Sequence, residues 1–122
     1  MKKGYFIGLL FCAVLLTGCS GISSTIADMQ MKSAKKSMES ENYDKAIKKL
    51  KRAVSIQKKN VDAYIMLADA YVKSGEQKEA EDTIDKLRDL DDVRLSGKQE
   101  EKVCLLDSKR IYSDILNNFY KT

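Results

Sequence analysis

Residues 43–87 read YDKAIKKLKRAVSIQKKNVDAYIMLADAYVKSGEQKEAEDTIDKL. This stretch decides the fold because it contains the end of one copy of a 34-residue pattern and most of a second copy. Three pairs of small or aliphatic residues each lie 34 residues apart: Ala34 and Ala68, Ala46 and Ala80, Leu50 and Ile84. Glu41-Asn42 stands at the turn of the first copy, and Gly75-Glu76 stands at the turn of the second. Self-similarity with this period predicts stacked pairs of helices whose small residues lie where the helices touch.

The second copy, residues 61–94, resembles a tetratricopeptide repeat at most consensus positions. The aromatic, small, turn and aliphatic positions are filled by Tyr64, Leu67, Ala68, Tyr71, Gly75, Ala80 and Ile84. The first copy, residues 27–60, keeps Ala34, Tyr43, Ala46, Leu50 and Ala53. It has Gln30 and Ser37 at the aromatic positions, and both copies lack the terminal proline, with Lys58 and Asp92 in its place. The resemblance implies an all-α fold of two helix-turn-helix repeats.

Helical periodicity and end signals set the expected helices of the two repeats. Thr25 with Asp28 is typical of a capping box, so the first helix should begin there and run to about Ser40. Asn60 suits the end of the second helix, and Gly75 should end the third. The second, third and fourth helices are expected at about residues 43–57, 61–74 and 77–90.

The C-terminal segment, about residues 97–121, is expected to be a capping helix that hides the last hydrophobic face of the repeats. It is either one helix or two helices with a break near Asp107-Ser108. Its apolar residues include Leu105, Ile111, Tyr112, Ile115, Leu116, Phe119 and Tyr120.

The N-terminus resembles the signal peptide of a bacterial lipoprotein. Lys2 and Lys3 form a positive head before the apolar residues 4–16, which as a helix span about 20 Å, less than a hydrocarbon core of roughly 30 Å. Leu16-Thr17-Gly18-Cys19 then resembles the lipobox, whose cysteine takes a diacylglyceryl group on its sulfur. The resemblance implies cleavage before Cys19 and diacylglyceryl and N-acyl lipid on Cys19, which anchor the protein in a bacterial membrane. The alternatives are an ordinary signal peptide or a short membrane anchor.

These features divide the chain into a signal peptide (1–18), a lipidated tether (19–24) and a tetratricopeptide-like helical domain (25–122). The tether is short, so we expect the folded part close to the membrane. In a host with two membranes, Ser20 resembles the residue that sends lipoproteins to the periplasmic face of the outer membrane. In any other host, the protein is expected on the outer face of the cell membrane.

Composition argues against catalysis and metal binding. The 122 residues carry a net charge of +4 and no histidine, so the commonest general base and a common metal ligand are missing. Cys12, Cys19 and Cys104 do not have the spacing of zinc ligands, and no glycine-rich phosphate loop is present. We therefore expect no enzyme activity, no metal and no cofactor beyond the covalent lipid. Export and a mild net charge also argue against nucleic acid as a partner.

In the family that the chain resembles, the first helix of each repeat lines a groove that holds a partner peptide. Carried onto this sequence, the groove positions include Met31, Lys35, Met38, Ile65, Asp69, Val72 and Lys73. The residues that clamp a terminal carboxylate in chaperone-binding members are absent, so the resemblance implies an apolar groove with scattered charge. The alternative is that Met31, Met38 and Val72 simply pack against neighbouring helices.

A basic stripe lies on the second expected helix, opposite its apolar face: Lys45, Lys48, Lys49 and Arg52. One interpretation is a solvated face, whose ion pairs each contribute well under about 1 kcal/mol. The other is a face held against an anionic leaflet, where each suitably placed charge gains about 1 kcal/mol.

The sequence as a whole indicates a non-catalytic, membrane-anchored lipoprotein that binds a protein or peptide partner in a bacterial cell-envelope assembly. The alternative is a self-associating structural lipoprotein whose repeats stack between chains, because two repeats leave hydrophobic ends. Cys104 is either a buried small hydrophobe or a free thiol that pairs two chains.

Overall fold

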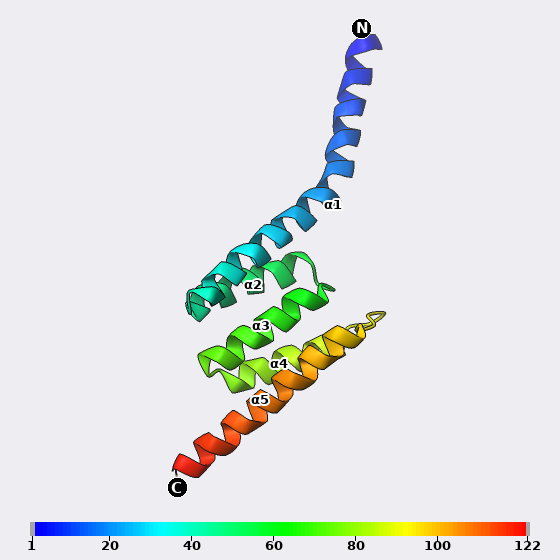
Figure 1. The fold of residues 1–122 in the computed structure, drawn as a ribbon. Helices are drawn as coiled ribbons and strands as arrows, with labels where there is room; N and C mark the ends of the chain where they lie inside the picture. Colours follow the sequence, from blue (N-terminus) through cyan, green and yellow to red (C-terminus); the bar gives the residue numbers. More distant parts are fainter. Residues whose placement is uncertain (1, 122) are drawn as a thin grey trace.

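The computed structural model describes the backbone of residues 2–121 and the side chains of residues 21–121. Over this part, the chain forms the helices α1 (Lys2–Glu39), α2 (Tyr43–Ile56), α3 (Val61–Ser74), α4 (Gln77–Arg88) and α5 (Gly97–Lys121). Successive helices lie against one another in a layered stack, with α1 at one end and α5 at the other (Figure 1). Together α1–α4 form two helix-turn-helix repeats, so the predicted all-α, tetratricopeptide-like fold is confirmed.

The residues that repeat every 34 positions form the centre of the stack. All six are at most 1% exposed: Ala34, Ala46, Leu50, Ala68, Ala80 and Ile84. The alanines let the helix backbones approach, and Leu50 and Ile84 fill the space between them. One buried cluster joins the two repeats around Leu50, and a second, around Ile84, joins the second repeat to α5 through Val103 and Leu106. The stack is therefore continuous from the first repeat to the C-terminal helix.

The turns are built by short polar side chains and one glycine. The side chains of Asn42 and Asn60 each accept a hydrogen bond from a backbone N–H in the first turn of α2 and α3. Asn60 thus caps the start of α3, whereas the sequence suggested that it ends α2. Gly75 ends α3 in the left-handed conformation, with φ of 87°, as predicted.

The start of the first helix differs from the prediction. Gly21–Ser24 belong to α1, so these residues do not form a separate extended tether, and Thr25 does not begin a helix. The hydroxyl groups of Ser24 and Thr25 both donate to the backbone carbonyl of Gly21, at 2.9 and 3.0 Å. These bonds are compatible with a continuing helix, and the chain has no proline to interrupt it.

The first repeat replaces its missing aromatic residue with a polar contact. Ser37, at the aromatic position, is 7% exposed and donates to the carbonyl of Ser33 at 3.1 Å. The ammonium group of Lys49 reaches across from α2 and donates to the hydroxyl groups of Ser33 and Ser37. Lys49 therefore faces α1, and the prediction that it belongs to the outward basic stripe is wrong.

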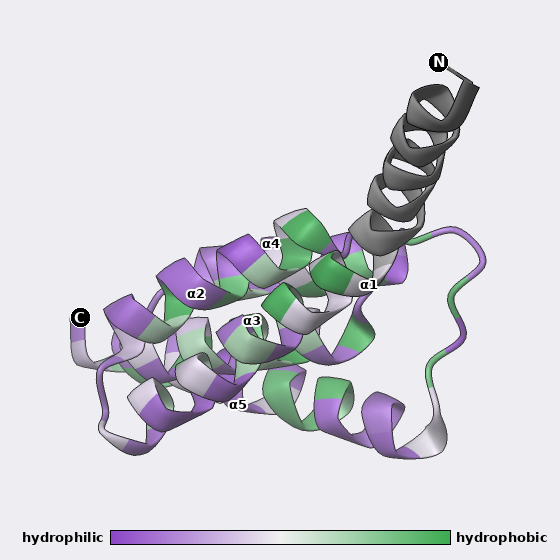
Figure 2. Ribbon diagram, turned by 90° about the horizontal axis from the view of Figure 1, so that it is seen from above, coloured by the Kyte–Doolittle hydropathy of each residue, from purple (hydrophilic) through white to green (hydrophobic). Residues whose placement is uncertain are grey.

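The C-terminal helix α5 is a single helix without a break at Asp107-Ser108. Val103 and Leu106 are its buried residues, and both join the second core cluster. Hydrophobic and hydrophilic residues alternate along α5 in Figure 2. The apolar residues in its second half are exposed, so α5 covers the end of the repeats but does not bury most of its own apolar side chains.

Candidate functional site

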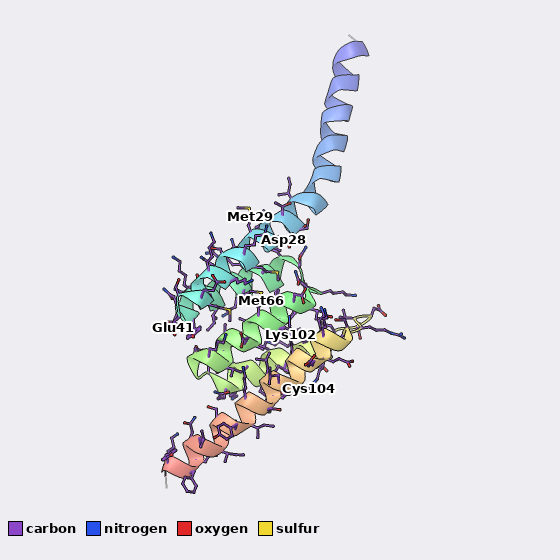
Figure 3. The ribbon with its side chains drawn as sticks, in the orientation of Figure 1. Asp28, Met29, Glu41, Met66, Lys102 and Cys104 are labelled. Atoms are coloured by element: carbon purple, nitrogen blue, oxygen red, sulfur yellow. The ribbon has the colours of Figure 1, made fainter. Side chains whose placement is uncertain are left out.

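A hollow of about 300 Å³ lies between α3 and α5. Its lining comes from both helices: Ile65, Met66, Asp69 and Lys73 from α3, and Lys102, Leu105, Leu106 and Lys109 from α5. Figure 3 shows Met66 and Lys102 on these two neighbouring helices. We call this hollow the α3–α5 groove.

The floor of the α3–α5 groove is apolar and belongs to the core. Ile65 and Leu106 are 6% and 5% exposed and pack in the same buried cluster. Met66 is half-buried, and Leu105 is 54% exposed at the edge. A rigid apolar floor with a flexible methionine beside it suits the insertion of an apolar side chain.

The rim of the groove is basic. Lys73 forms an ion pair with Asp69 at 3.1 Å, four residues earlier on α3. Lys102 and Lys109 line the groove from α5, and neither forms an ion pair with any side chain that the structure describes. They lie seven residues apart, so their Cα atoms are separated by about 10 Å along one side of the helix. The groove therefore offers two ammonium groups to an acidic partner.

Polar contacts fix α5 against the second repeat and so hold the groove open. Arg88 donates to a carboxylate oxygen of Asp107 at 2.6 Å, and the amide of Gln77 donates to the hydroxyl of Ser113 at 3.1 Å. Near the start of α5, the amide of Gln99 donates to a carboxylate oxygen of Asp62 on α3 at 3.0 Å. These contacts span three turns or more of α5, so both walls of the groove are parts of one packed unit.

The predicted groove residues divide into three groups. Ile65, Asp69 and Lys73 line the α3–α5 groove. Met31, Met38 and Val72 are half-buried and pack against the core clusters, as the alternative interpretation held. Lys35 is exposed on α1 and does not line the α3–α5 groove.

The sequence did not predict Met66 of α3 or any of the groove lining from α5, a helix that has no counterpart in the repeat pattern. Lys102, Leu105, Leu106 and Lys109 were not assigned to a groove. The seven-residue spacing of the two lysines on a helical segment was a signal that could have placed them on one side of α5. Which side faces α3 depends on the tertiary packing.

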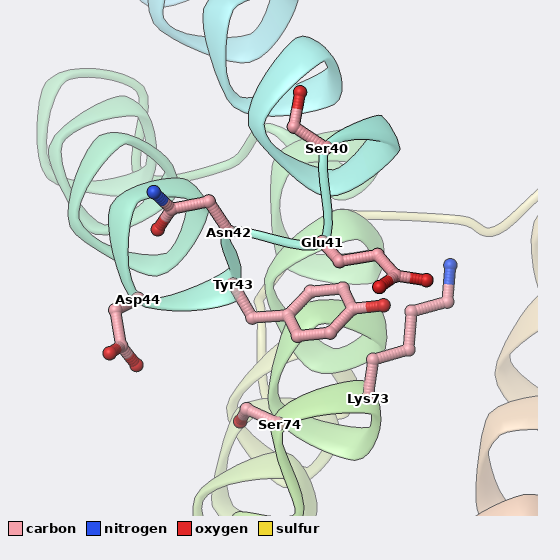
Figure 4. A pocket seen from close by; sticks show the side chains of 7 residues that line it. All are labelled: Ser40, Glu41, Asn42, Tyr43, Asp44, Lys73 and Ser74. Carbon is pink, nitrogen blue, oxygen red and sulfur yellow. The ribbon is translucent and has the colours of Figure 1, made fainter.

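A second, polar hollow lies at the turn between α1 and α2 and is lined by Ser40, Glu41, Asn42, Tyr43, Asp44, Lys73 and Ser74. In Figure 4, the Glu41 carboxylate, the Lys73 ammonium group and the Tyr43 hydroxyl lie on the same side of this hollow. It has no apolar floor, which makes it the weaker candidate for a docking site. Lys73 lines both hollows and so lies where the α3–α5 groove reaches the turn.

The outer surface of α2 is basic. Lys45, Lys48 and Arg52 of the predicted stripe are exposed, whereas Lys49 faces α1. A further hollow of about 390 Å³ beside α2 is lined by Lys51, Lys58 and Lys86 together with the aromatic side chains of Tyr64 and Tyr71. Burial raises the pKa of Tyr71 above its usual 10.0, and the charges of Glu76 and Glu79 act in the same direction.

The remaining predicted sites concern the cysteines and metals. The side chain of Cys19, the predicted lipidation site, lies outside the described side chains. Cys104 is an exposed free thiol, so the prediction of a buried hydrophobe is wrong. Among the described side chains, no three His, Cys, Asp or Glu residues are grouped as metal ligands would be. Within the same part of the chain, no helix combines the length and apolarity needed to cross a membrane.

Comparison with known proteins agrees with the repeat geometry. Residues 37–95 match the tetratricopeptide repeat family, a stretch that runs from the end of α1 through α4. Neither the curated proteins nor the solved structures yield a match to this chain. Residues 37–95 are therefore similar to tetratricopeptide repeats, a family that generally serves as a protein-interaction module, and α5 lies outside the matched stretch.

Proposed function

We propose that this chain is a membrane-anchored, non-catalytic adaptor whose α3–α5 groove binds a protein or peptide partner in a bacterial cell-envelope assembly. The observation that carries the proposal is the groove itself. Its floor is apolar, its two walls are fixed in one packed unit, and its rim holds two lysines that are not paired within the described part of the chain. An exposed repeat surface with this character fits docking better than chemistry.

The groove favours a segment that carries one or two apolar side chains next to carboxylates. A partner's apolar side chain that packs on Ile65 and Leu106 would be removed from water, because these two residues are part of the core. Carboxylates about two helical turns apart would meet Lys102 and Lys109. The lysines would then set the direction of the bound segment, and the apolar floor would supply most of its affinity.

Membrane anchorage rests on the sequence Leu16-Thr17-Gly18-Cys19 and on the apolar residues before it. Because Gly21 is already helical, the six residues from Gly21 to the first buried residue, Ala27, extend only about 9 Å. A lipid on Cys19 would thus keep the repeats near the bilayer surface. In this arrangement, the exposed residues Lys45, Lys48 and Arg52 are proposed to face anionic lipid, each gaining about 1 kcal/mol.

The docking half of the proposal is tested by photocrosslinking in intact cells. A photoreactive residue replaces Lys102 in the groove or, as a matched control, Lys51 on the outer surface of α2. We expect position 102 to capture one defined segment of another protein, and a synthetic peptide of that segment to compete for capture. Capture of the same proteins from positions 102 and 51, or no competition by the peptide, would refute docking in the groove.

The anchoring half is tested by mass and by location. The Cys19→Ser chain is expected to lose the mass of the lipid and to leave the membrane fraction, whereas Cys12→Ser is expected to change neither. An unchanged mass and an unchanged membrane association in Cys19→Ser would contradict the anchor. This result would leave the groove experiment intact, because the two halves are measured separately.

A further inference from the structure

The C-terminal helix α5 has two different faces. Its inner face packs on the repeats through Val103 and Leu106, which are 3% and 5% exposed. One and two turns further on, Arg110 keeps only 15% of its side chain exposed, and Ser113 accepts a hydrogen bond from Gln77. The inner face therefore follows the repeats over at least three turns.

The outer face of α5 is apolar, although a terminal helix usually presents a polar face to solvent. Leu105, Tyr112 and Phe119 recur every seven residues and are 54%, 65% and 75% exposed. Four further apolar residues flank this line, each at least 36% exposed: Ile111, Ile115, Leu116 and Tyr120. We call these seven residues the outer stripe. A seven-residue repeat of apolar residues on one face is typical of a helix that pairs with another helix.

The outer stripe is large enough to support a specific interface. Its seven side chains are each roughly 150–250 Å² in full area, so at exposures of 36–81% they present on the order of 900 Å². Monomeric soluble proteins rarely expose an apolar patch larger than a few hundred Å². Stable interfaces bury about 800 Å² per partner, and the outer stripe reaches this size when its flanking residues Ile111 and Tyr120, on either side of the helix, are covered as well.

We propose that the outer stripe binds the outer stripe of a second copy of this chain, so that two α5 helices pair side by side. Lys109 lies on the same face, between Leu105 and Tyr112, but from Ile111 to Tyr120 the only charged residue is Asp114, so two copies can meet there without opposing like charges in the interface. The carboxylates nearest to it in sequence, Asp107 and Asp114, form ion pairs with Arg110 on the inner side. This proposal goes beyond docking in the α3–α5 groove, and its surface meets the groove at Leu105, which belongs to both.

Other surfaces of the described chain fit the outer stripe less well. Among the described side chains of α1, from Gly21 on, three large apolar residues are exposed, Ile22, Ile26 and Met29, and they span only two turns. A contact between these residues and the outer stripe of the next chain would leave about half of the stripe uncovered, and it would build an open filament. The outer stripe is matched in length and in residue type by another α5.

A lipid surface is also a poorer occupant than a second copy. Helices α1 and α5 lie at opposite ends of the stack (Figure 1), so the outer stripe faces away from α1. With the proposed anchor on α1, the stripe would point away from the membrane that holds the protein. In this proposal α5 serves two tasks, since one edge lines the groove and the outer stripe pairs copies, and Leu105 lies at the boundary between the two surfaces.

Photocrosslinking of the full-length chain in the membranes of the producing cells tests the pairing. A photoreactive residue replaces Tyr112 or Leu116 in the outer stripe, or Met29 on α1 as an apolar control whose exposure, 64%, matches the 65% of Tyr112. We expect positions 112 and 116 to yield adducts of two copies, crosslinked from α5 to α5, and position 29 to yield none. Ile115→Glu should lower the yield at least about tenfold by placing a charge in the interface, whereas Asn117→Glu, exposed on another side of α5, should leave it unchanged.

Each other result would overturn the pairing. Adducts to lipid indicate a membrane surface, adducts to a different protein indicate a partner helix, and adducts to residues 22–29 of a second copy indicate head-to-tail stacking. Equal yields from positions 29 and 112 indicate crowding alone, and no adduct indicates an unoccupied stripe. Far-ultraviolet circular dichroism of both glutamate variants checks that the helices persist, which is expected because Ile115 is 59% exposed and Asn117 is also exposed.

Discussion

Two adjacent leucines on α5 allow the packing of this helix to be tested with one kind of substitution. Leu106 is 5% exposed and packs in the second core cluster, whereas Leu105 is 54% exposed on the outer stripe. Leu106→Ala and Leu105→Ala remove the same atoms from neighbouring positions, with nearly equal effects on helix propensity. Any difference in the free energy of unfolding therefore measures which face of α5 packs on the repeats.

The structure sets the size of the expected difference. Buried leucine-to-alanine substitutions cost about 2–5 kcal/mol, and the cost falls when the site can be refilled. Leu106 borders the open α3–α5 groove, which water can enter, so we expect the lower end, about 2–3 kcal/mol. Leu105 already has more than half of its surface in water, so its substitution should cost about 0.5 kcal/mol or less.

Urea unfolding of residues 21–122, followed by circular dichroism at low protein concentration, measures both free energies. This segment contains every buried residue that the structure describes. With a slope of about 1–2 kcal/mol per molar urea, Leu106→Ala should lower the midpoint by about 1–3 M, and Leu105→Ala should shift it by about 0.5 M or less. Equal shifts, or a larger shift for Leu105→Ala, would show that α5 does not pack as described.

Three further substitutions test local features of the fold. Gly75→Ala should cost about 1 kcal/mol of stability, because a φ of 87° strains any residue that has a Cβ. The added Cβ itself would meet no atom within 4 Å, so no steric clash adds to this cost. A cost near zero in urea unfolding would contradict the left-handed cap. Asn60→Ala should lose about 1 kcal/mol of stability with the cap of α3, and an unchanged midpoint would show that the cap contributes nothing. Burial, with the charges of Glu76 and Glu79, raises the pKa of Tyr71, so its contribution to stability is complete below pH 10 and is lost as the pH rises further. Stability measured from pH 8 to 11 should therefore fall more steeply for the natural chain than for Tyr71→Phe, and parallel curves would refute this.

The repeat core was predictable because its residues recur with a fixed period. Ala46 and Ala80, or Leu50 and Ile84, needed only their spacing to be placed in the interior. Gly75 was predictable for a similar reason, since a glycine after a periodic segment is typical of a left-handed helix end. Local chemistry and periodicity together determine these positions.

Lys49 and Thr25 were predicted wrongly because the deciding contact was outside the local pattern. Helical spacing places Lys49 with the basic stripe. In the structure, however, the ammonium group of Lys49 donates a hydrogen bond across the helix pair to the hydroxyl of Ser37, the serine at the aromatic position of the first repeat. Thr25 has the sequence of a cap, yet its hydroxyl donates to the carbonyl of Gly21 in a helix that has already begun. In both cases, a tertiary or preceding contact overrides the local preference.

The candidate site was only half predictable. Ile65, Asp69 and Lys73 followed from the resemblance to repeat proteins, because they lie on the first helix of the second repeat. Lys102 and Lys109 belong to α5, which repeats nothing, and the direction of its faces depends on how Val103 and Leu106 dock on the core. A capping helix was expected from the hydrophobic end of the stack, but its apolar outer stripe was not.

The affinity of the segment captured from position 102 tests the central claim, that partners dock in the α3–α5 groove. Its binding to the chain with Lys102→Gln and Lys109→Gln is compared with binding to the chain with Lys51→Gln and Lys86→Gln, which removes the same charge from the far side of α3. At up to about 1 kcal/mol for each exposed ion pair, we predict roughly fivefold to thirtyfold weaker binding for the groove variant at low salt, and no change for the control. Unchanged binding to the groove variant, or an equal loss in both variants, would contradict the claim.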